Sequence, residues 1–293
     1  MIATSQAELP GPKIDTLLEN TLRDIGIPPR PAILDRIAGE MDKDEPDFKR
    51  LAAIIGADVS LSAALIKTTN SPFFGFRSRV RSVNEALMVL GLDVASRAIA
   101  GIVLRQVLPD TPHLERFWDA SARIARLSGW LAQRIAASQV RPGDAYTFGL
   151  FRDCGIPLLL RRFPGYGQVL AEANWEDSLN FTAVEDAHLP TNHAMVGCLL
   201  AQSWWLPEET CLAIRHHHDV TVMEMPALSP PLSSPALIAL AQFAEHLAQR
   251  HSGLNHTCEW PKLGPACLRL LKLSDADVES IFIEALPMMS AED

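Results

Sequence analysis

The chain has 293 residues, which is enough to bury a sizeable core in one large or two modest domains. Apolar residues make up 48% of it and aromatic residues only 6%, and this balance, rich in alanine and leucine, favours helices over sheets. The formal net charge of −9 argues against a broad nucleic-acid or anionic-membrane surface, because both need a basic face. The net charge does not exclude one small basic patch.

The cysteines and the hydropathy pattern indicate the compartment. Five scattered cysteines form no CxxC pair and no zinc-finger spacing, so we expect reduced, mostly buried thiols. The start of the chain, Met1 to Gln6, lacks a basic segment followed by an apolar run, and no window approaches the ~18 unbroken apolar residues of a membrane span. We therefore expect a soluble, cytoplasmic protein without a membrane segment.

The first half of the chain alternates helical patterns with strong breakers. Residues 1–12 are polar and contain Pro10-Gly11-Pro12, so we expect a flexible lead there. Apolar residues then recur with the helical period of 3.6 in four stretches, which are Ile14–Ile25, Ile33–Met41, Phe48–Ile55 and Leu61–Thr68. The stretch Asn70-Ser-Pro-Phe-Phe-Gly-Phe76 follows as a loop. Its three phenylalanines predict an apolar plug folded back on the core.

Three arginines after this loop, Arg77, Arg79 and Arg81, alternate with small or apolar residues. We expect them to face solvent, with an anion site as the alternative. The next helix begins at Ser82 and breaks at Gly91, and another runs from about Asp93 to Val107.

The second half continues in helices. The predicted ones start after Phe117 and run through Ile135, then cover 145–160, 195–205, 236–248 and 263–286. Pro226 to Pro235 carries four prolines and several serines, which is typical of a linker. Period-2 runs long enough for a sheet are absent from the sequence, so we predict an all-α fold.

Two short segments carry the chemistry. The run Arg215-His-His-His-Asp219 offers clustered imidazoles and a carboxylate, which are the ligand types of a hydrolytic metal centre. The run Phe148-Gly-Leu-Phe-Arg-Asp-Cys-Gly155 places Asp153 on an apolar helix, with Arg152 before it. A guanidinium stays protonated and has no lone pair to give, so Arg152 cannot ligate a cation.

Short sequence segments in both halves of the chain match the motifs of one known domain family. They are Pro28–Leu34, Leu51–Ile55, Asp58–Ala63, the motif Asn70-Ser71-Pro72-Phe73-Phe74-Gly75, Val83–Leu92, Phe117-Trp118, Gly149–Gly155, Glu185, His193 with Gly197, Trp205–Pro207 and Ala213–Asp219. Over roughly Leu22 to Val220 the chain resembles the HDOD domain, the HD-related output domain of bacterial signalling proteins.

This resemblance implies a multi-helical HD-domain-like bundle with an N-terminal helical subdomain. The HDOD domain would cover 13–225, divided into an N-terminal subdomain at 13–110 and an HD-like subdomain at 113–225. The Pro/Ser-rich linker at 226–235 would follow, and helices at 236–293 would pack on the HD-like core.

HD phosphohydrolases hold divalent metals with His and Asp side chains from several helices, and the resemblance lets those ligands be compared one by one. Three positions have lost a ligand, because Ala120, Arg152 and Gln242 stand there. The remaining candidates are Asp153, His193, His217 and His218. We therefore expect no resident metal or cofactor, only a remnant site that can take an adventitious divalent ion or a small anion. Arg152 would pair with Asp153 in place of the missing metal.

The histidine run also has a plainer interpretation. Consecutive residues on a helix point about 100° apart, so His216, His217 and His218 cannot all face one ion. In this interpretation one or two of them bond to the core and one is exposed. Glu185 and Asp219 are expected as helix-capping or surface carboxylates.

Three functions stay open. The leading one is a non-catalytic bacterial regulatory module that acts by protein–protein contact with a sensor kinase, a response regulator or a cyclic-di-GMP enzyme, without nucleic acid or membrane. The first alternative is a divergent metal-dependent phosphohydrolase that uses the four remaining donors. The second is a sensor that binds a nucleotide or phosphate in the old cleft through Arg152.

Overall fold

The computed structural model describes residues 25–71, 74, 76, 78–108, 114–224, 235–254 and 256–290. Its regular structure in these ranges is helical throughout, with no strand, which confirms the all-α prediction. The expected lead at 1–12 and residues 226–234 of the expected linker lie outside the described residues.

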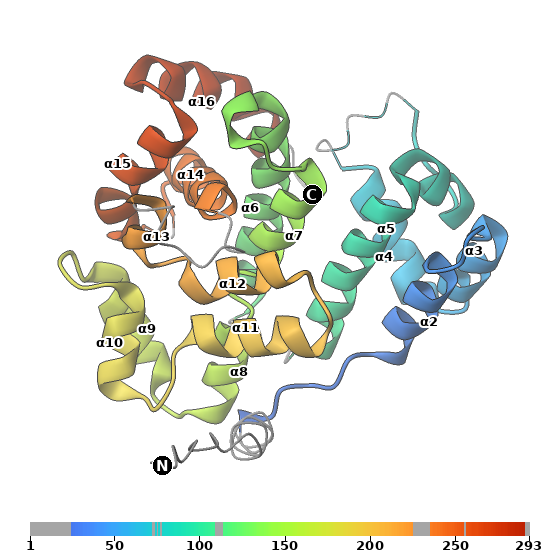
Figure 1. The fold of residues 1–293 in the computed structure, drawn as a ribbon, viewed down its shortest axis with the longest axis horizontal. Helices are drawn as coiled ribbons and strands as arrows, with labels where there is room; N and C mark the ends of the chain where they lie inside the picture. The colour runs from blue at the N-terminus through green and yellow to red at the C-terminus, as the bar shows by residue number, and fades with distance from the viewer. Residues whose placement is uncertain are drawn as a thin grey trace, which may run out of the picture.

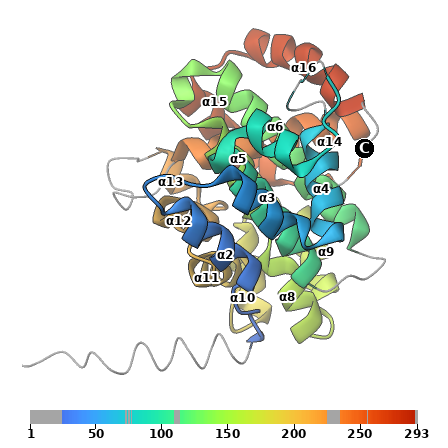
Figure 2. The same cartoon turned by 90° about the vertical axis from the view of Figure 1, so that its right-hand side faces the viewer.

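The helices form two groups that lie side by side in Figure 1. The N-terminal group consists of α2 (Ala32–Met41), α3 (Phe48–Gly56), α4 (Val59–Thr69) and α5 (Val83–Val107). Figure 2 views this group from its outer side. The second group contains α6 (Glu115–Arg134), a 3₁₀ turn (Ala136–Ser138), α7 (Pro142–Phe151), α8 (Gly155–Arg162), α9 (Tyr166–Trp175), α10 (Phe181–His188), α11 (His193–Ser203), α12 (Glu208–His216), α13 (Val220–Glu224), α14 (Pro235–Ser252), α15 (Glu259–Leu271) and α16 (Asp275–Ser290).

Three of the four helices of the N-terminal group begin at a capping side chain. The carboxylates of Asp47 and Asp58 and the hydroxyl of Ser82 accept hydrogen bonds from backbone N–H groups in the first turns of α3, α4 and α5. Gly91 adopts φ 73° inside α5, a conformation that glycine reaches without strain, and it bends the helix where the sequence predicts a break.

Helix α5 is long and apolar enough to cross a membrane by length and composition alone. Its backbone bends at Gly91, and it packs against α2, α3, α4 and α7 within the protein. These contacts make it a core helix that joins the two groups.

Helix α14 is the central helix of the second group (Figure 1). It packs against α6, α7 and α15, and its residues from Leu237 to Ala244 are all buried. A helix that is buried on every side needs partners all round, so α14 belongs to the core.

The loop after α4 is held by a side-chain amide. Asn70 donates from Nδ2 to the carbonyl of Val80 and accepts at Oδ1 from the N–H of Val80, both at 2.8 Å. Phe74 stacks on Phe76 with ring centroids 6.1 Å apart, and it also meets Tyr146 of α7. Phe74 is half-buried and Phe76 is 40% exposed, so the plug is partial in this part of the loop. Pro72, Phe73 and Gly75 lie outside the described residues.

All five cysteines are free. Cys154, Cys198, Cys211 and Cys267 are buried and Cys258 is partly buried. Burial raises the pKa of Cys198 to about 11 and that of Cys267 to about 12, so these thiols stay protonated near neutral pH. The expectation of mostly buried thiols is confirmed.

Candidate functional site

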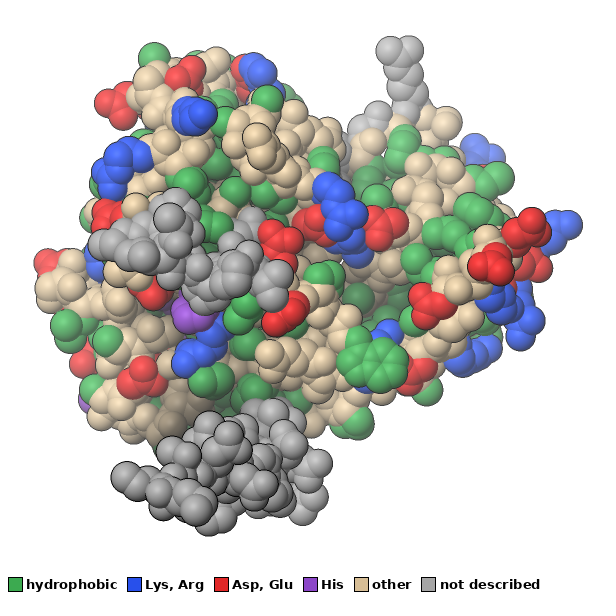
Figure 3. All heavy atoms as spheres, in the orientation of Figure 1, with side chains coloured by type: hydrophobic (Ala, Val, Ile, Leu, Met, Phe, Trp, Pro, Cys, Tyr) green, Lys and Arg blue, Asp and Glu red, His purple; other side chains and the backbone are tan. Residues whose placement is uncertain are grey.

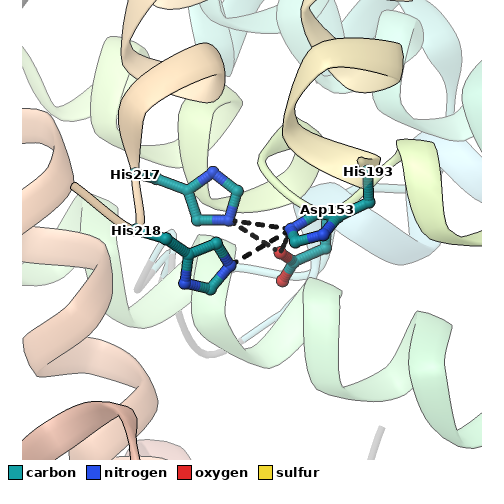
Figure 4. A group of neighbouring side chains, drawn as sticks. All are labelled: Asp153, His193, His217 and His218. Atoms are coloured by element: carbon teal, nitrogen blue, oxygen red, sulfur yellow. Dashed lines mark hydrogen bonds and ion pairs between the residues drawn. The ribbon is translucent and has the colours of Figure 1, made fainter. Parts of the chain in front are cut away.

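Four side chains from three parts of the chain meet in the second group of helices (Figure 4). Asp153 follows α7, His193 is the first residue of α11, and His217 and His218 follow the end of α12. One ligand atom from each lies within 4.8 Å of the others. The structure thus brings together the four donors that the sequence singles out.

A break between α7 and α8 places Asp153 in the cluster. The sequence predicts one helix over 145–160, and this is wrong, because α7 ends at Phe151 and α8 begins at Gly155. Gly155 packs directly on the backbone of α11, where a Cβ atom would come within 2.1 Å of the carbonyl oxygen of His193. Only glycine allows this approach, which brings the start of α8 and the start of α11 together.

The four donor atoms lie within 4.8 Å of one another, and four of their six separations are between 3.1 and 3.6 Å. The Nε2 atom of His193 lies 3.2 Å from Nε2 of His217 and 3.1 Å from Nε2 of His218. Oδ1 of Asp153 lies 3.2 Å from Nε2 of His217 and 3.6 Å from Nε2 of His193. Three imidazole nitrogens and one carboxylate oxygen therefore face a common centre.

The end of α12 explains how two consecutive histidines share the site. The helix ends at His216, so His217 and His218 lie in a turn and the helical rotation of 100° does not separate them. Their ring centroids are 4.1 Å apart and both side chains are buried. His216 is half-buried and does not join the cluster, and burial lowers its pKa.

Each histidine is oriented from behind by an acceptor. Nδ1 of His193 lies 2.7 Å from Glu185, Nδ1 of His217 lies 2.7 Å from the carbonyl of Ile214, and Nδ1 of His218 lies 2.5 Å from Glu259. In the neutral form of each ring, an acceptor at Nδ1 favours the tautomer with the proton there, which leaves Nε2 able to ligate an ion at the common centre.

Glu185 is buried, so the expected surface position is wrong, although it does accept the backbone N–H of His193 at the start of α11 and is not one of the four donors. Its side chain is fully buried, and it accepts hydrogen bonds from the phenol of Tyr166 and from the ring and backbone N–H of His193. Asp219, by contrast, caps the next turn by accepting from the backbone and hydroxyl of Thr221, as expected.

Burial and the neighbouring charges set the protonation of the cluster. Burial disfavours the charged imidazole and holds the pKa of His218 well below its ordinary value. For His193, burial also acts to lower the pKa, but the charges of Glu185 and Asp153 outweigh it and the pKa is raised. Burial opposes ionisation of Asp153, yet Arg152 and His217 hold its pKa well below the usual range. A carboxylate anion therefore stands at the cluster.

Arg152 pairs with the carboxylate of Asp153 and neutralises its charge. Arg152 is 3% exposed, and its guanidinium pairs with Asp153 at 2.9 Å and with Glu245 of α14 at 2.7 Å. The expected pairing with Asp153 is confirmed. Nη1 of Arg152 is buried and has no hydrogen-bond partner among the described residues.

The second carboxylate of this ion pair, Glu245, was not predicted. Sequence comparison pointed to Gln242, which lies three residues earlier on α14 and donates to the carbonyl of His217 at 3.4 Å. Residues three apart share a helix face, and this spacing is the one signal that could have indicated Glu245. Glu245 also lines a small cavity of about 170 Å³ together with Ala120, the position at which the resemblance would place the first histidine.

These donors fit one divalent ion. In tetrahedral zinc sites with bonds of 2.0–2.1 Å the ligand atoms are about 3.3 Å apart, close to the spacings in this cluster. Three oriented imidazoles with inward lone pairs and an ionised carboxylate form a suitable donor set. Next to it, the cation of Arg152 lies between Asp153 and Glu245 and opposes a second ion there.

Comparisons with known proteins agree with this architecture. A family model of the HDOD domain matches residues 27–220. An uncharacterized protein of Treponema pallidum (strain Nichols) is 27% identical over 195 residues, which cover 66% of this chain and 38% of that protein. The uncharacterized protein YuxH of Bacillus subtilis (strain 168) is 32% identical over 63 residues, 22% of this chain and 15% of that protein. The chain thus spans less than half the length of these two relatives.

Solved structures share the fold over nearly the whole chain. An HDOD domain protein of unknown function from Geobacter sulfurreducens is 25% identical with a TM-score of 0.66, covering 94% of this chain and 96% of that one. A suspected phosphohydrolase from Shewanella amazonensis SB2B is 18% identical with a TM-score of 0.68, covering 92% and 94%. A suspected signal transduction protein from Marinobacter aquaeolei VT8 is 21% identical with a TM-score of 0.64, covering 95% and 65%. With its family match across 27–220 and this helical architecture, the chain belongs to the HDOD domain family.

Proposed function

We propose that the chain is a cytoplasmic regulatory module of bacterial signal transduction that acts by protein–protein contact and does not catalyse hydrolysis. The observation that carries this proposal is the buried ion pair of Arg152 with Asp153 and Glu245. It places a permanent cation where the resemblance to HD phosphohydrolases expects the histidine of a metal-binding His-Asp pair.

The donor geometry supports the same conclusion. Catalytic zinc sites use three protein ligands and leave a position for water, whereas structural sites are closed by four. Here four side chains converge, and His193, His217 and His218 are all at least nine-tenths buried. Such a set offers no open position to a substrate. An ion bound there would supply a cross-link between the end of α7, α11 and α12 rather than an activated water.

Metal content is a separate question from activity. The absence of a resident metal stays a prediction. The spacing and orientation of the four donors argue instead that the protein can bind one ion. A single structural ion is compatible with a non-catalytic module, because metal binding then contributes to folding.

Exposed aromatic side chains support recognition of partner proteins. Trp205 and Trp175 are each 73% exposed, and the guanidinium of Arg30 lies 4.4 Å above the ring of Trp205. Tryptophan and arginine are enriched at the energetic centres of protein interfaces. A sensor kinase, a response regulator or a cyclic-di-GMP enzyme is the partner class we propose, in line with the suspected signalling role of the Marinobacter protein.

The first alternative is a divergent metal-dependent phosphohydrolase, and the observation on its side is that the four donors lie close enough to hold one ion. The second alternative, an anion sensor at Arg152, is less favoured, because two carboxylates already neutralise that guanidinium.

The test combines metal analysis with an activity assay. Protein purified without added metal is analysed for transition ions, reloaded with Zn²⁺, Mn²⁺ or Fe²⁺, and assayed with bis(p-nitrophenyl) phosphate beside the variant His193→Ala. We expect at most one ion per chain and no hydrolysis above that of His193→Ala. Metal-dependent turnover that His193→Ala abolishes would contradict the proposal.

The contact itself is tested with a two-hybrid panel of sensor kinases, response regulators and cyclic-di-GMP enzymes from the source organism. Trp205→Ser is expected to weaken the interaction. Leu254→Ser, at a side chain that is 60% exposed, is the matched control.

A further inference from the structure

A second, larger hollow lies between the two groups of helices. This interhelical cleft has a volume of about 1030 Å³, and its walls come from α4, α5, α6 and α7 and from the segment around Arg79–Arg81. None of the four clustered donor residues lines it. It is therefore a site of its own.

The cleft is basic in an acidic protein. Five cationic side chains and one carboxylate, Asp119, line it, whereas the whole chain carries 35 acidic and 26 basic residues. The cations are Lys67, Arg79, Arg81, Arg105 and Arg126. Arg105 is 4.0 Å from Asp119, at the limit of an ion pair, and the exposed side chains of Lys67, Arg79 and Arg81 make no ion pair within the described residues. This arrangement leaves positive charge facing an open space.

The rest of the wall is mostly apolar and aromatic. Ile66, Ile102 and Leu150 line it together with the aromatic rings of Trp118 and Tyr146. Trp118 is 2% exposed, and its Nε1–H has no acceptor among the residues that the structure describes.

The hydroxyl of Ser71, another residue of the wall, is also buried and unpaired within the described part of the chain. Both atoms are enclosed by the protein, so a ligand in the cleft would reach them only if the wall rearranged.

We propose that this cleft binds a phosphorylated nucleoside, with the base against the apolar wall and the phosphates among the arginines. Guanidinium groups suit phosphate oxygens because they donate in a planar fork, and aromatic and aliphatic surfaces accept the flat face of a base. The volume is at the upper end of the usual range for small-ligand sites.

The distribution of the positive charge favours a small ligand over a nucleic acid. The cations gather inside a concavity, while acidic and basic side chains are interspersed over the outer face that Figure 3 shows. A polynucleotide needs a continuous basic track instead. Because the walls belong to both helix groups, a bound nucleotide would bridge them.

Binding is measured on the full chain by isothermal titration calorimetry with the ribonucleoside triphosphates of adenine, guanine, cytosine and uracil. The test variant is the double charge reversal Arg79→Glu/Arg81→Glu. The control is Arg36→Glu/Lys49→Glu, which changes the net charge equally at exposed residues of α2 and α3 that do not line the cleft. We expect binding of at least one nucleotide, weakened about tenfold or more by the test variant and within twofold of wild type in the control.

A second variant probes the apolar wall. Ala63 is an exposed residue of α4 that lines the cleft, so Ala63→Trp fills the space without changing charge or core. It is expected to weaken the nucleotide more than it weakens inorganic pyrophosphate.

Several results would overturn the proposal. They are no heat from any nucleotide at millimolar concentration, equal losses in the two charge reversals, pyrophosphate binding as tightly as the nucleotide, or a single-stranded oligonucleotide binding more tightly than either. Nucleotide binding that is lost in His193→Ala but kept in Arg79→Glu/Arg81→Glu would place the ligand at the four-donor cluster and also refute it.

Discussion

Nδ1 of His193 lies 2.7 Å from Oε2 of Glu185, and both side chains are completely buried. Glu185 also accepts a hydrogen bond from the phenol of Tyr166, whose pKa is raised by burial and by this carboxylate. The three side chains therefore form one buried polar chain that joins α9, α10 and α11 and fixes the ring of His193 in the cluster.

Replacing Glu185 tests this chain. Glu185→Ala leaves the Nδ1–H of His193 and the hydroxyl of Tyr166 without their acceptor, which costs about 1–3 kcal/mol for each buried group left unpaired. We expect the free energy of unfolding in urea to fall accordingly, and Zn²⁺ affinity to fall about 10–100-fold. Glu185→Gln keeps an acceptor oxygen and should lose less. The control is Glu172→Ala, at an exposed carboxylate of α9; an equal loss there would disprove the role of the buried chain.

Replacing Arg152 tests the internal ion pair. Arg152→Met leaves the carboxylates of Asp153 and Glu245 without their cation, and breaking a buried pair in this way costs about 3–5 kcal/mol. We expect this loss in chemical denaturation, with a partial recovery in Arg152→Met/Glu245→Met.

The matched control for the Arg152 variants is the exposed ion pair between Arg250 and Glu279. Its side chains are 36% and 58% exposed, so Arg250→Met should cost no more than about 1 kcal/mol. Similar losses in the two arginine variants would show that burial does not decide the effect.

Replacing Asn70 tests the loop clamp. Asn70→Ala removes both hydrogen bonds to the backbone of Val80, so the amide of Val80 should exchange with deuterium faster. Hydrogen-exchange mass spectrometry on peptides that cover 78–82 checks this. Asn84→Ala, at an exposed position of α5, should leave that exchange unchanged. Protection that survives in Asn70→Ala would mean that other contacts hold the loop.

A histidine outside the cluster predicts a dependence on pH. His246 stacks on Trp260 with ring centroids 4.1 Å apart, and burial with the nearby Arg250 lowers its pKa from 6.5 to about 4. Between these values the unfolded chain binds the proton and the folded chain does not, so the stability that this residue contributes is lost as pH falls from 6.5 towards 4.

His246→Phe keeps the stack and removes the proton site. The variant should therefore lose less stability than wild type over this range, measured by thermal unfolding at matched ionic strength. Parallel curves for the two proteins would contradict the prediction.

Local patterns predicted the helices better than the contacts between them. The break at Gly91 and the end of α4 near Asn70 follow from residue types that cap or break helices. The interruption at 152–154 depends on Gly155 meeting the backbone of α11, which periodicity does not show. In the same way the four donors could be named from the sequence, whereas Glu185, Glu245 and Glu259 act through neighbours 8, 93 and 41 residues away.

The burial of α14 has a consequence for where this domain ends. The family match stops at residue 220, yet Glu245 of α14 and Glu259 of α15 contact Arg152 and His218 inside the matched region. A polypeptide cut after Glu224 would strip the apolar faces of α6 and α7 of their cover. We therefore expect the unit that folds cooperatively to extend beyond the family match and include the C-terminal helices, and limited proteolysis of the native protein should then spare α14.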